Sequence, residues 1–203
     1  MAKSAAKTGA KAQKKAALPA APAPAVRRRT ALEGRAAGQP WVSVTPAAPA
    51  QRLSLRAPRD SVAALSKALG LDLPERPMAS AGEGGRAALW LGPDEWLVIE
   101  EGRDALPAAL SGVKAFHSAV DVSHRNLGIL VAGRGAEATL ASGCPRDLSQ
   151  AAFPIGSCAR TVLGKAEIVV WRTGEEAFRV ECWRSFSDYV FIFLAEAARD
   201  AGV

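Results

Sequence analysis

The sequence is poor in the residues that build metal centres and disulfide frameworks, with three cysteines and two histidines among 203 residues. Three cysteines leave one unpaired in any disulfide scheme, and no CxxC spacing occurs, so a reducing, cytoplasmic interior is favoured. No Cys/His spacing resembles a zinc site, and P-loop, GxGxxG and HExxH motifs are absent. These absences argue against a metal or covalent-haem function, and we expect this chain alone to bind no cofactor.

Long apolar runs are also missing. The longest, Tyr189 to Ala195, is far shorter than the roughly 18 residues that a membrane-spanning helix needs. The only candidate for the apolar core of a secretory signal, Ala16 to Val26, is interrupted by three prolines. We therefore expect a soluble protein that does not contact a membrane.

The positive charge is confined to the N-terminus. Residues 1–35 carry nine Lys and Arg side chains against one Glu, whereas residues 36–203 carry 17 basic and 19 acidic side chains. This Lys-, Ala- and Pro-rich stretch has little apolar surface to offset an ordering cost of about 1–2 kcal/mol per residue. We predict a disordered tail over residues 1–35 and a folded domain over residues 36–203. The tail is interpreted as a solubilising leader or, alternatively, as a basic arm that contacts an acidic subunit or nucleic acid.

Apolar periodicity and turn residues predict an α+β fold for residues 36–203, with a mainly antiparallel sheet and packed helices. Helices are predicted at 62–69, 104–110, 135–141 and 186–197. Strands are predicted at 42–44, 87–91, 96–100, 127–132, 158–163, 166–171 and 177–183. Gly70 is expected to end the first helix, and Gly164 to open a tight hairpin turn.

Two tryptophans flank the predicted turn Gly92-Pro93-Asp94-Glu95. A four-residue loop would pair Leu91 with Trp96 and Trp90 with Leu97, which sends the two indoles to opposite faces of the ribbon. One indole then enters the core and the other needs a second cover, from this chain or from another. Trp90 and Trp96 are therefore candidate subunit-interface residues.

The last predicted helix has more apolar residues than one buried face requires. Its expected buried stripe follows helical spacing and consists of Phe186, Tyr189, Val190, Phe193, Leu194 and Ala197. Phe191 and Ile192 fall outside that stripe, so either the helix is enclosed on two sides or these residues contact another chain. We count both as interface candidates. A strand over residues 189–194 is the alternative, because these residue types also favour sheets.

The run Asp121-Val122-Ser123-His124 resembles the Asp-Val-Ser-His signature of the folate-dependent aminomethyltransferases, the glycine-cleavage T-protein superfamily. The following apolar segment, Leu127 to Gly133, extends the resemblance. In that superfamily the motif's aspartate lies at the tetrahydrofolate and is the main catalytic carboxylate. The resemblance makes Asp121 the candidate for a remnant folate-binding pocket.

A longer similarity covers about residues 30–200 and points to one family, the gamma subunit of heterotetrameric sarcosine oxidase. The matching stretches are Ala88 to Leu97, the Asp121 motif, Gly143-Cys144-Pro145, Asp147-Leu148, Phe153-Pro154, Gly156, Cys158, Thr161 and Arg184-Ser185-Phe186. The resemblance implies a fold similar to the folate-binding domain of the aminomethyltransferases.

What the family implies is a cytoplasmic complex of alpha, beta, gamma and delta subunits. That complex oxidatively demethylates sarcosine to glycine and produces hydrogen peroxide and 5,10-methylenetetrahydrofolate. It uses FAD, FMN, NAD, zinc and tetrahydrofolate through its other subunits, whereas the gamma subunit holds no redox cofactor. The resemblance therefore predicts a structural subunit of an enzyme complex.

A lost active-site feature argues that this chain is not catalytic. Aminomethyltransferases of this superfamily carry a Gly-Gly-containing hairpin followed by paired aspartates, where this chain has only the tight turn Leu163-Gly164-Lys165-Ala166. Without positioning partners, a lone carboxylate transfers protons poorly. Asp121 is interpreted as a structural carboxylate that binds backbone amides or Arg125, with residual folate contact or catalysis as alternatives. For the whole chain, the alternatives are a stand-alone tetrahydrofolate-binding transferase or repair protein, and a nucleic-acid-binding protein acting through the tail.

Overall fold

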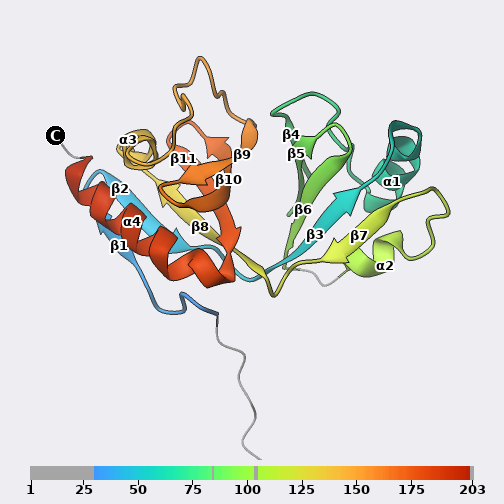
Figure 1. The fold of residues 1–203 in the computed structure, drawn as a ribbon, viewed down its shortest axis with the longest axis horizontal. Helices are drawn as coiled ribbons and strands as arrows, with labels where there is room; N and C mark the ends of the chain where they lie inside the picture. The colour runs from blue at the N-terminus through green and yellow to red at the C-terminus, as the bar shows by residue number, and fades with distance from the viewer. Residues whose placement is uncertain (1–29, 84, 103–104, 202–203) are drawn as a thin grey trace, which may run out of the picture.

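The computed structural model describes residues 30–83, 85–102 and 105–201, which form two antiparallel sheets with helices on their outer sides (Figure 1). The six-stranded sheet has the order β1 (Ala37–Gln39), β2 (Val42–Pro46), β8 (Asn126–Ala132), β11 (Ala177–Trp183), β10 (Ala166–Gly174) and β9 (Cys158–Leu163). The five-stranded sheet has the order β4 (Ser80–Glu83), β5 (Arg86–Gly92), β6 (Glu95–Glu101), β3 (Ala50–Arg56) and β7 (Ser118–Asp121). The predicted α+β class with antiparallel pairing is confirmed.

Four α-helices and two 3-10 turns are found in the described part of the chain. They are η1 (Arg59–Ser61), α1 (Val62–Leu69), α2 (Leu106–Leu110), α3 (Ala136–Ala141), η2 (Arg184–Phe186) and α4 (Ser187–Asp200). α1 and α2 cover the outer face of the five-stranded sheet, and α3 and α4 cover that of the six-stranded sheet (Figure 1). Gly70 ends α1 at φ +63° and Gly164 opens the β9–β10 turn at φ +57°, as predicted.

The core lies in three layers because successive side chains of a strand point to opposite faces. On β10, Ile168 and Val170 pack towards α3 and α4, whereas Val169 and Trp171 pack towards the other sheet. A third cluster lies between the five-stranded sheet and α1 and α2. Both sheets are therefore covered on two faces, which explains strands such as β6 that are buried along almost their whole length.

One long ribbon runs through both sheets. β2 pairs with β8 in the six-stranded sheet, with Ser43 opposite Ala132, and the continuing chain pairs β3 with β7 in the five-stranded sheet, with Arg56 opposite Ser118. The β2–β3 segment and the β7–β8 segment therefore cross from one sheet to the other side by side. This ribbon carries the Asp121 motif at its crossing point.

Buried ion pairs join the two sheets beside that crossing. Glu181 on β11 accepts hydrogen bonds from Arg52 on β3 at 2.5 and 3.1 Å and from Arg179 at 2.8 Å, and Arg179 also binds Glu101 on β6. The side chains of Arg52, Arg179 and Glu181 are 4%, 5% and 1% exposed. Gly128 makes room for them, because a Cβ atom there would lie 2.7 Å from the Glu181 Oε1.

The predicted pairing of the two tryptophans is wrong. A bulge at Leu91 shifts the register, so that Trp90 pairs with Trp96 and Gly92 with Glu95. Both indoles consequently lie on the face covered by α1 and α2, and the Trp96 Nε1 donates to the Pro74 carbonyl at 2.8 Å. The cover that one of the two indoles was expected to need is therefore supplied by this chain itself.

The last helix is confirmed, but its buried face is shifted. Phe191, predicted to lie outside the stripe, is 5% exposed, whereas Phe186 and Tyr189 are 42% and 39% exposed. The cause is that the N-terminal segment of the fold, around Arg35, covers α4 on a second side. There the Arg35 guanidinium lies 5.8 Å from the centre of the Phe191 ring and forms an ion pair with Asp188 at 3.0 Å.

The packed structure reaches back before the predicted boundary at residue 36. Leu32, assigned to the tail, is 1% exposed and belongs to the core under α4. Residues 1–29 of the predicted tail lie outside the described residues, as does Asp104, the predicted start of the helix that is found over Leu106–Leu110. The apolar Leu32 and the charge of Arg35 place this segment on the fold rather than in the tail.

Candidate functional site

Asp121, the candidate from the Asp-Val-Ser-His motif, ends β7 and organises the turn that follows it. Its carboxylate accepts hydrogen bonds from the Ser123 backbone N–H at 2.8 Å and the Ser123 hydroxyl at 2.5 Å. The Ser123 hydroxyl in turn accepts the Arg52 backbone N–H at 2.9 Å. Through Ser123, the carboxylate thus connects the ribbon's crossing point to β3.

A groove of about 880 Å³ opens beside this turn. Its lining includes Gln51, Asp121, His124, Asn126 and Arg184, together with residues 46–50 of the crossing strand. The structure therefore brings Asp121 and His124 to one surface, together with the basic side chain of Arg184 and polar side chains. This is the part of the fold where the sequence placed a remnant folate pocket.

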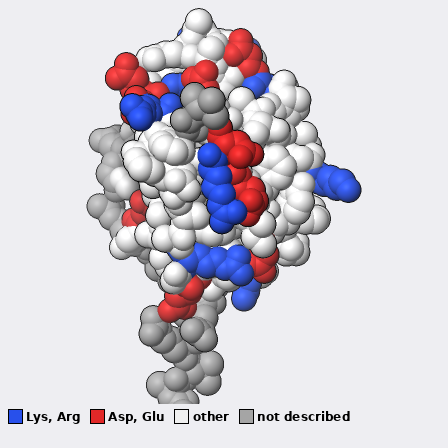
Figure 2. Space-filling model, turned by 90° about the vertical axis from the view of Figure 1, so that its left-hand side faces the viewer, with Lys and Arg blue, Asp and Glu red and all other residues white. Residues whose placement is uncertain are grey.

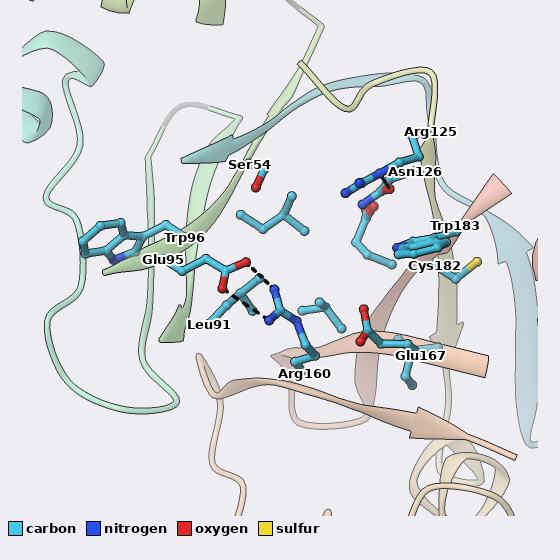
Figure 3. A pocket seen from close by; sticks show the side chains of 14 residues that line it. Ser54, Leu91, Glu95, Trp96, Arg125, Asn126, Arg160, Glu167, Cys182 and Trp183 are labelled. Carbon is cyan, nitrogen blue, oxygen red and sulfur yellow. Dashed lines mark hydrogen bonds and ion pairs between the residues drawn. The ribbon is translucent and has the colours of Figure 1, made fainter. Parts of the chain in front are cut away.

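A second, smaller hollow of about 50 Å³ lies between the two sheets (Figure 3). Arg160 on β9 reaches across it to Glu95 on β6, with a shortest distance of 2.5 Å, and Arg125 stacks over Trp183 with 5.3 Å to the ring centre. A water molecule occupies about 30 Å³ in the liquid, so this hollow has room for a water or two but not for a folate or a flavin.

Glu95 is a carboxylate at this hollow that two arginines, Arg160 and Arg56, contact. Burial alone would raise its pKa, but the hydrogen bond and charge of Arg160 and the charge of Arg56 hold the pKa below its ordinary value of 4.5. The same pairing raises the pKa of Arg160. The pair is therefore ionised at neutral pH and links the two sheets rather than supplying a proton.

The three cysteines are buried and reduced. Burial raises the pKa of Cys158 and of Cys182 to about 12, and the Cys158 thiol donates to the Ala79 carbonyl at 3.3 Å. A thiol with such a pKa is a poor nucleophile and a poor metal ligand at neutral pH. Within the described residues, no three His, Cys, Asp or Glu side chains gather in a way that could hold a metal ion.

The four interface candidates lie in different environments. Trp96 and Phe191 are 1% and 5% exposed inside this chain's own core, and Trp90 packs against the same cluster as Trp96. Ile192 is 53% exposed. Trp96 and Phe191 are thus covered within this chain, whereas Ile192 is exposed.

Sequence reasoning missed the other large apolar side chains at the surface near Ile192. Trp183, Phe186 and Tyr189 are each about two-fifths exposed. For Phe186 and Tyr189, only the position of the buried face could have revealed the exposure, because both residues also fit a buried stripe. Figure 2 views the side of the molecule that lies to the left in Figure 1, where charged side chains form a few mixed groups with uncharged surface between them.

The fold places the chain in a known structural class. It is similar to the glycine cleavage system aminomethyltransferase T from Bartonella henselae, with a TM-score of 0.58 and 14% identity over 79% of this chain and 49% of that one. At this identity the similarity concerns the fold alone, which is the fold expected from the Asp-Val-Ser-His motif.

Sequence comparisons define the family. Residues 56–200 match the model of the sarcosine oxidase gamma subunit family, and the chain belongs to that family. It is 33% identical to the sarcosine oxidase subunit gamma of Corynebacterium sp. (strain U-96), covering 86% of this chain and 88% of that protein. It is 36% identical to the subunit gamma of Arthrobacter sp., covering 66% and 68%.

A solved structure extends this similarity to three dimensions. A chain of the heterotetrameric sarcosine oxidase from Corynebacterium sp. U-96, determined in complex with pyrrole 2-carboxylate, superposes with a TM-score of 0.79 and 30% identity. The match covers 87% of this chain and 97% of that one. Within the described residues, no helix is long and apolar enough to span a membrane.

Proposed function

We propose that this chain is the gamma subunit of a cytoplasmic heterotetrameric sarcosine oxidase that demethylates sarcosine to glycine. The products would be hydrogen peroxide and 5,10-methylenetetrahydrofolate. The observation that carries the proposal is the match to 97% of a chain of such a complex. The comparisons do not favour a stand-alone folate transferase or repair protein, or a nucleic-acid-binding protein.

The proposed partners are alpha, beta and delta subunits. These subunits would hold the FAD, FMN, NAD, zinc and tetrahydrofolate of the complex, while this chain holds none of them. The thiols of Cys158 and Cys182, whose raised pKa makes them poor metal ligands, support the assignment of the zinc to another subunit. The role left to this chain is to stabilise the assembly by contact with its neighbours.

Co-expression tests the assembly. The tagged chain, produced together with the alpha, beta and delta subunits, is expected to purify with yellow companions that form hydrogen peroxide when sarcosine is added. Produced alone, it is expected to fold but to be less stable and more prone to aggregation than in the complex. Recovery of the tagged chain as a stable monomer, without any of the co-expressed subunits, would contradict the proposal.

We further propose that Asp121 is a structural carboxylate and not a catalytic one. Its bonds to the Ser123 backbone and hydroxyl support this role. In the purified complex, Asp121→Asn should leave kcat and KM for sarcosine, and the KM for tetrahydrofolate, within about twofold, because a structural carboxylate does not contact the reacting atoms.

The alternative roles of Asp121 predict different results. Loss of kcat by a factor of about 100 or more in an intact Asp121→Asn complex would indicate a general acid–base role. A raised KM for tetrahydrofolate with unchanged kcat would indicate a remnant folate contact. Ser123→Ala, which removes one bond to the same carboxylate, is the matched control for a purely structural effect.

A further inference from the structure

Large apolar side chains follow one another at every third position from the end of β11 along α4. Trp183, Phe186, Tyr189 and Ile192 are 41%, 42%, 39% and 53% exposed. Phe186 at the N-cap of α4, Tyr189 and Ile192 stand three positions apart, so each side chain neighbours the next on the helix surface. Trp183 belongs to β11 and joins this row through its ring contact with Phe186. We call this set the α4 ridge.

The α4 ridge is held in place before any partner arrives. The Trp183 and Phe186 rings lie 6.2 Å apart between centres, and the Tyr189 hydroxyl accepts the Lys165 backbone N–H at 3.1 Å. Rigid aromatic side chains lose little conformational entropy on binding, which makes them efficient anchors at interfaces. The ridge therefore has the physical properties of a preformed docking surface.

Both signs of charge occur beside the ridge, but the carboxylates there face arginines other than Arg125 and Arg184: Glu167, which lines the same hollow as Trp183, interacts with Arg160. Arg125 stacks over Trp183, and Arg184 follows Trp183 in sequence; both are exposed, and neither has a carboxylate partner within the described residues. The acidic side chain closest in sequence on α4, Asp188, is neutralised by Arg35 at 3.0 Å. A surface that complements the ridge would therefore carry carboxylates beside an apolar patch.

The ridge is also continuous with both hollows of the molecule. Trp183 and Arg125 line the hollow between the sheets, and Arg184 lines the groove beside Asp121. A partner seated on the ridge would reach the mouth of each hollow and remove these polar side chains from solvent. This continuity gives the apolar ridge a polar rim, the arrangement found in stable protein interfaces.

We propose that the α4 ridge, with Arg125 and Arg184 at its rim, is the surface by which this chain docks to another subunit of the complex. The partner's contacting face is an apolar patch flanked by carboxylates. This inference rests on the proposed function and adds the location of the contact and the chemistry of its occupant.

Matched substitutions in the co-expressed complex test the inference. Ile192→Asp disrupts the ridge, and its control, Ile155→Asp, changes an isoleucine that is 55% exposed elsewhere. Arg184→Glu reverses the rim charge, and its control, Arg134→Glu, changes an exposed arginine in the turn before α3. Because all four side chains are exposed, a failure to fold is not expected, and circular dichroism of the purified complex or chain checks this.

The ridge variants should recover at least about tenfold less of the other subunits per mole of tagged chain, and both controls should stay within about twofold. Recovery of ridge variants at the wild-type level would overturn the inference while leaving the proposed function intact. Failure of the wild-type chain to recover any subunit would overturn both. Self-association of the wild-type chain that Ile192→Asp abolishes would assign the ridge to a second copy and overturn the proposed partner.

Discussion

Glu181 is a buried carboxylate of the six-stranded sheet that pairs with an arginine of the five-stranded sheet. Its carboxylate, 1% exposed, accepts two hydrogen bonds from Arg52 and one from Arg179, whose side chains are 4% and 5% exposed. Glu181→Ala would leave both guanidinium groups buried with fewer partners. Breaking a buried pair by removing one member costs about 3–5 kcal/mol, a large part of the roughly 5–15 kcal/mol that stabilises a domain.

Urea unfolding of the chain, followed by tryptophan fluorescence, measures this loss. With a urea dependence near 2 kcal/mol per molar, the midpoint of Glu181→Ala should fall by about 1.5–2.5 M. Glu101→Ala is the matched control, because the Glu101 side chain binds the same Arg179 but is 43% exposed. Its loss should cost about 0–1 kcal/mol.

A double substitution separates charge from packing. Replacing Arg52 by Met and Glu181 by Leu removes a buried pair together, so the double variant should recover part of the stability lost by Glu181→Ala. Arg179 keeps its bond to Glu101 in that variant. A Glu181→Ala cost below about 1 kcal/mol, or one no larger than that of Glu101→Ala, would refute the reasoning.

Three further predictions concern other parts of the fold. Phe191→Ala should cost about 3–5 kcal/mol in urea unfolding and Ile192→Ala about 0.5 kcal/mol or less, because only Phe191 is buried; equal costs would contradict the observed helix face. Burial raises the pKa of Cys158 and Cys182 to about 12, so iodoacetamide should label neither thiol in the folded chain at pH 8 and both after unfolding, as mass spectrometry would detect. The pKa of Glu95 is lowered on folding, so the stability it contributes is present above about pH 4.5 and is lost as the pH falls through the folded value. Glu95→Gln should flatten the acid side of a stability–pH profile, and an unchanged profile would contradict the role of this pair.

Local patterns were enough to predict the fold class. Alternating apolar residues marked the strands, and glycines at positive φ marked the end of α1 and the β9–β10 turn, because these signals depend only on near neighbours. The register of the β5–β6 hairpin could not be obtained in this way. A bulge inserts one unpaired residue, Leu91, and a shift of one residue moves every following side chain to the other face.

The features that could not be predicted from the sequence all depend on contacts between residues far apart in the chain. Arg52 and Glu181 are 129 positions apart, and charged residues are buried only when paired, so neither could be assigned to the interior before the sheets were known. Helical spacing within α4 does not reveal that Arg35 covers Phe191, because Arg35 lies far from the helix in the sequence. The motif singles out Asp121 by resemblance, whereas its bonds to Ser123 follow from the turn geometry.

The ribbon of β2–β3 and β7–β8 has a consequence for how the chain is synthesised. β2 emerges from the ribosome early, yet its sheet neighbour β8 follows only after the whole of the five-stranded sheet up to β7. During that interval the Val42 and Val44 side chains, both buried in the finished protein, have no β8 to pack beside. Pairing across such separations is slow, so the nascent chain passes through a stage with exposed strand edges, in which chaperones or waiting partner subunits would protect it.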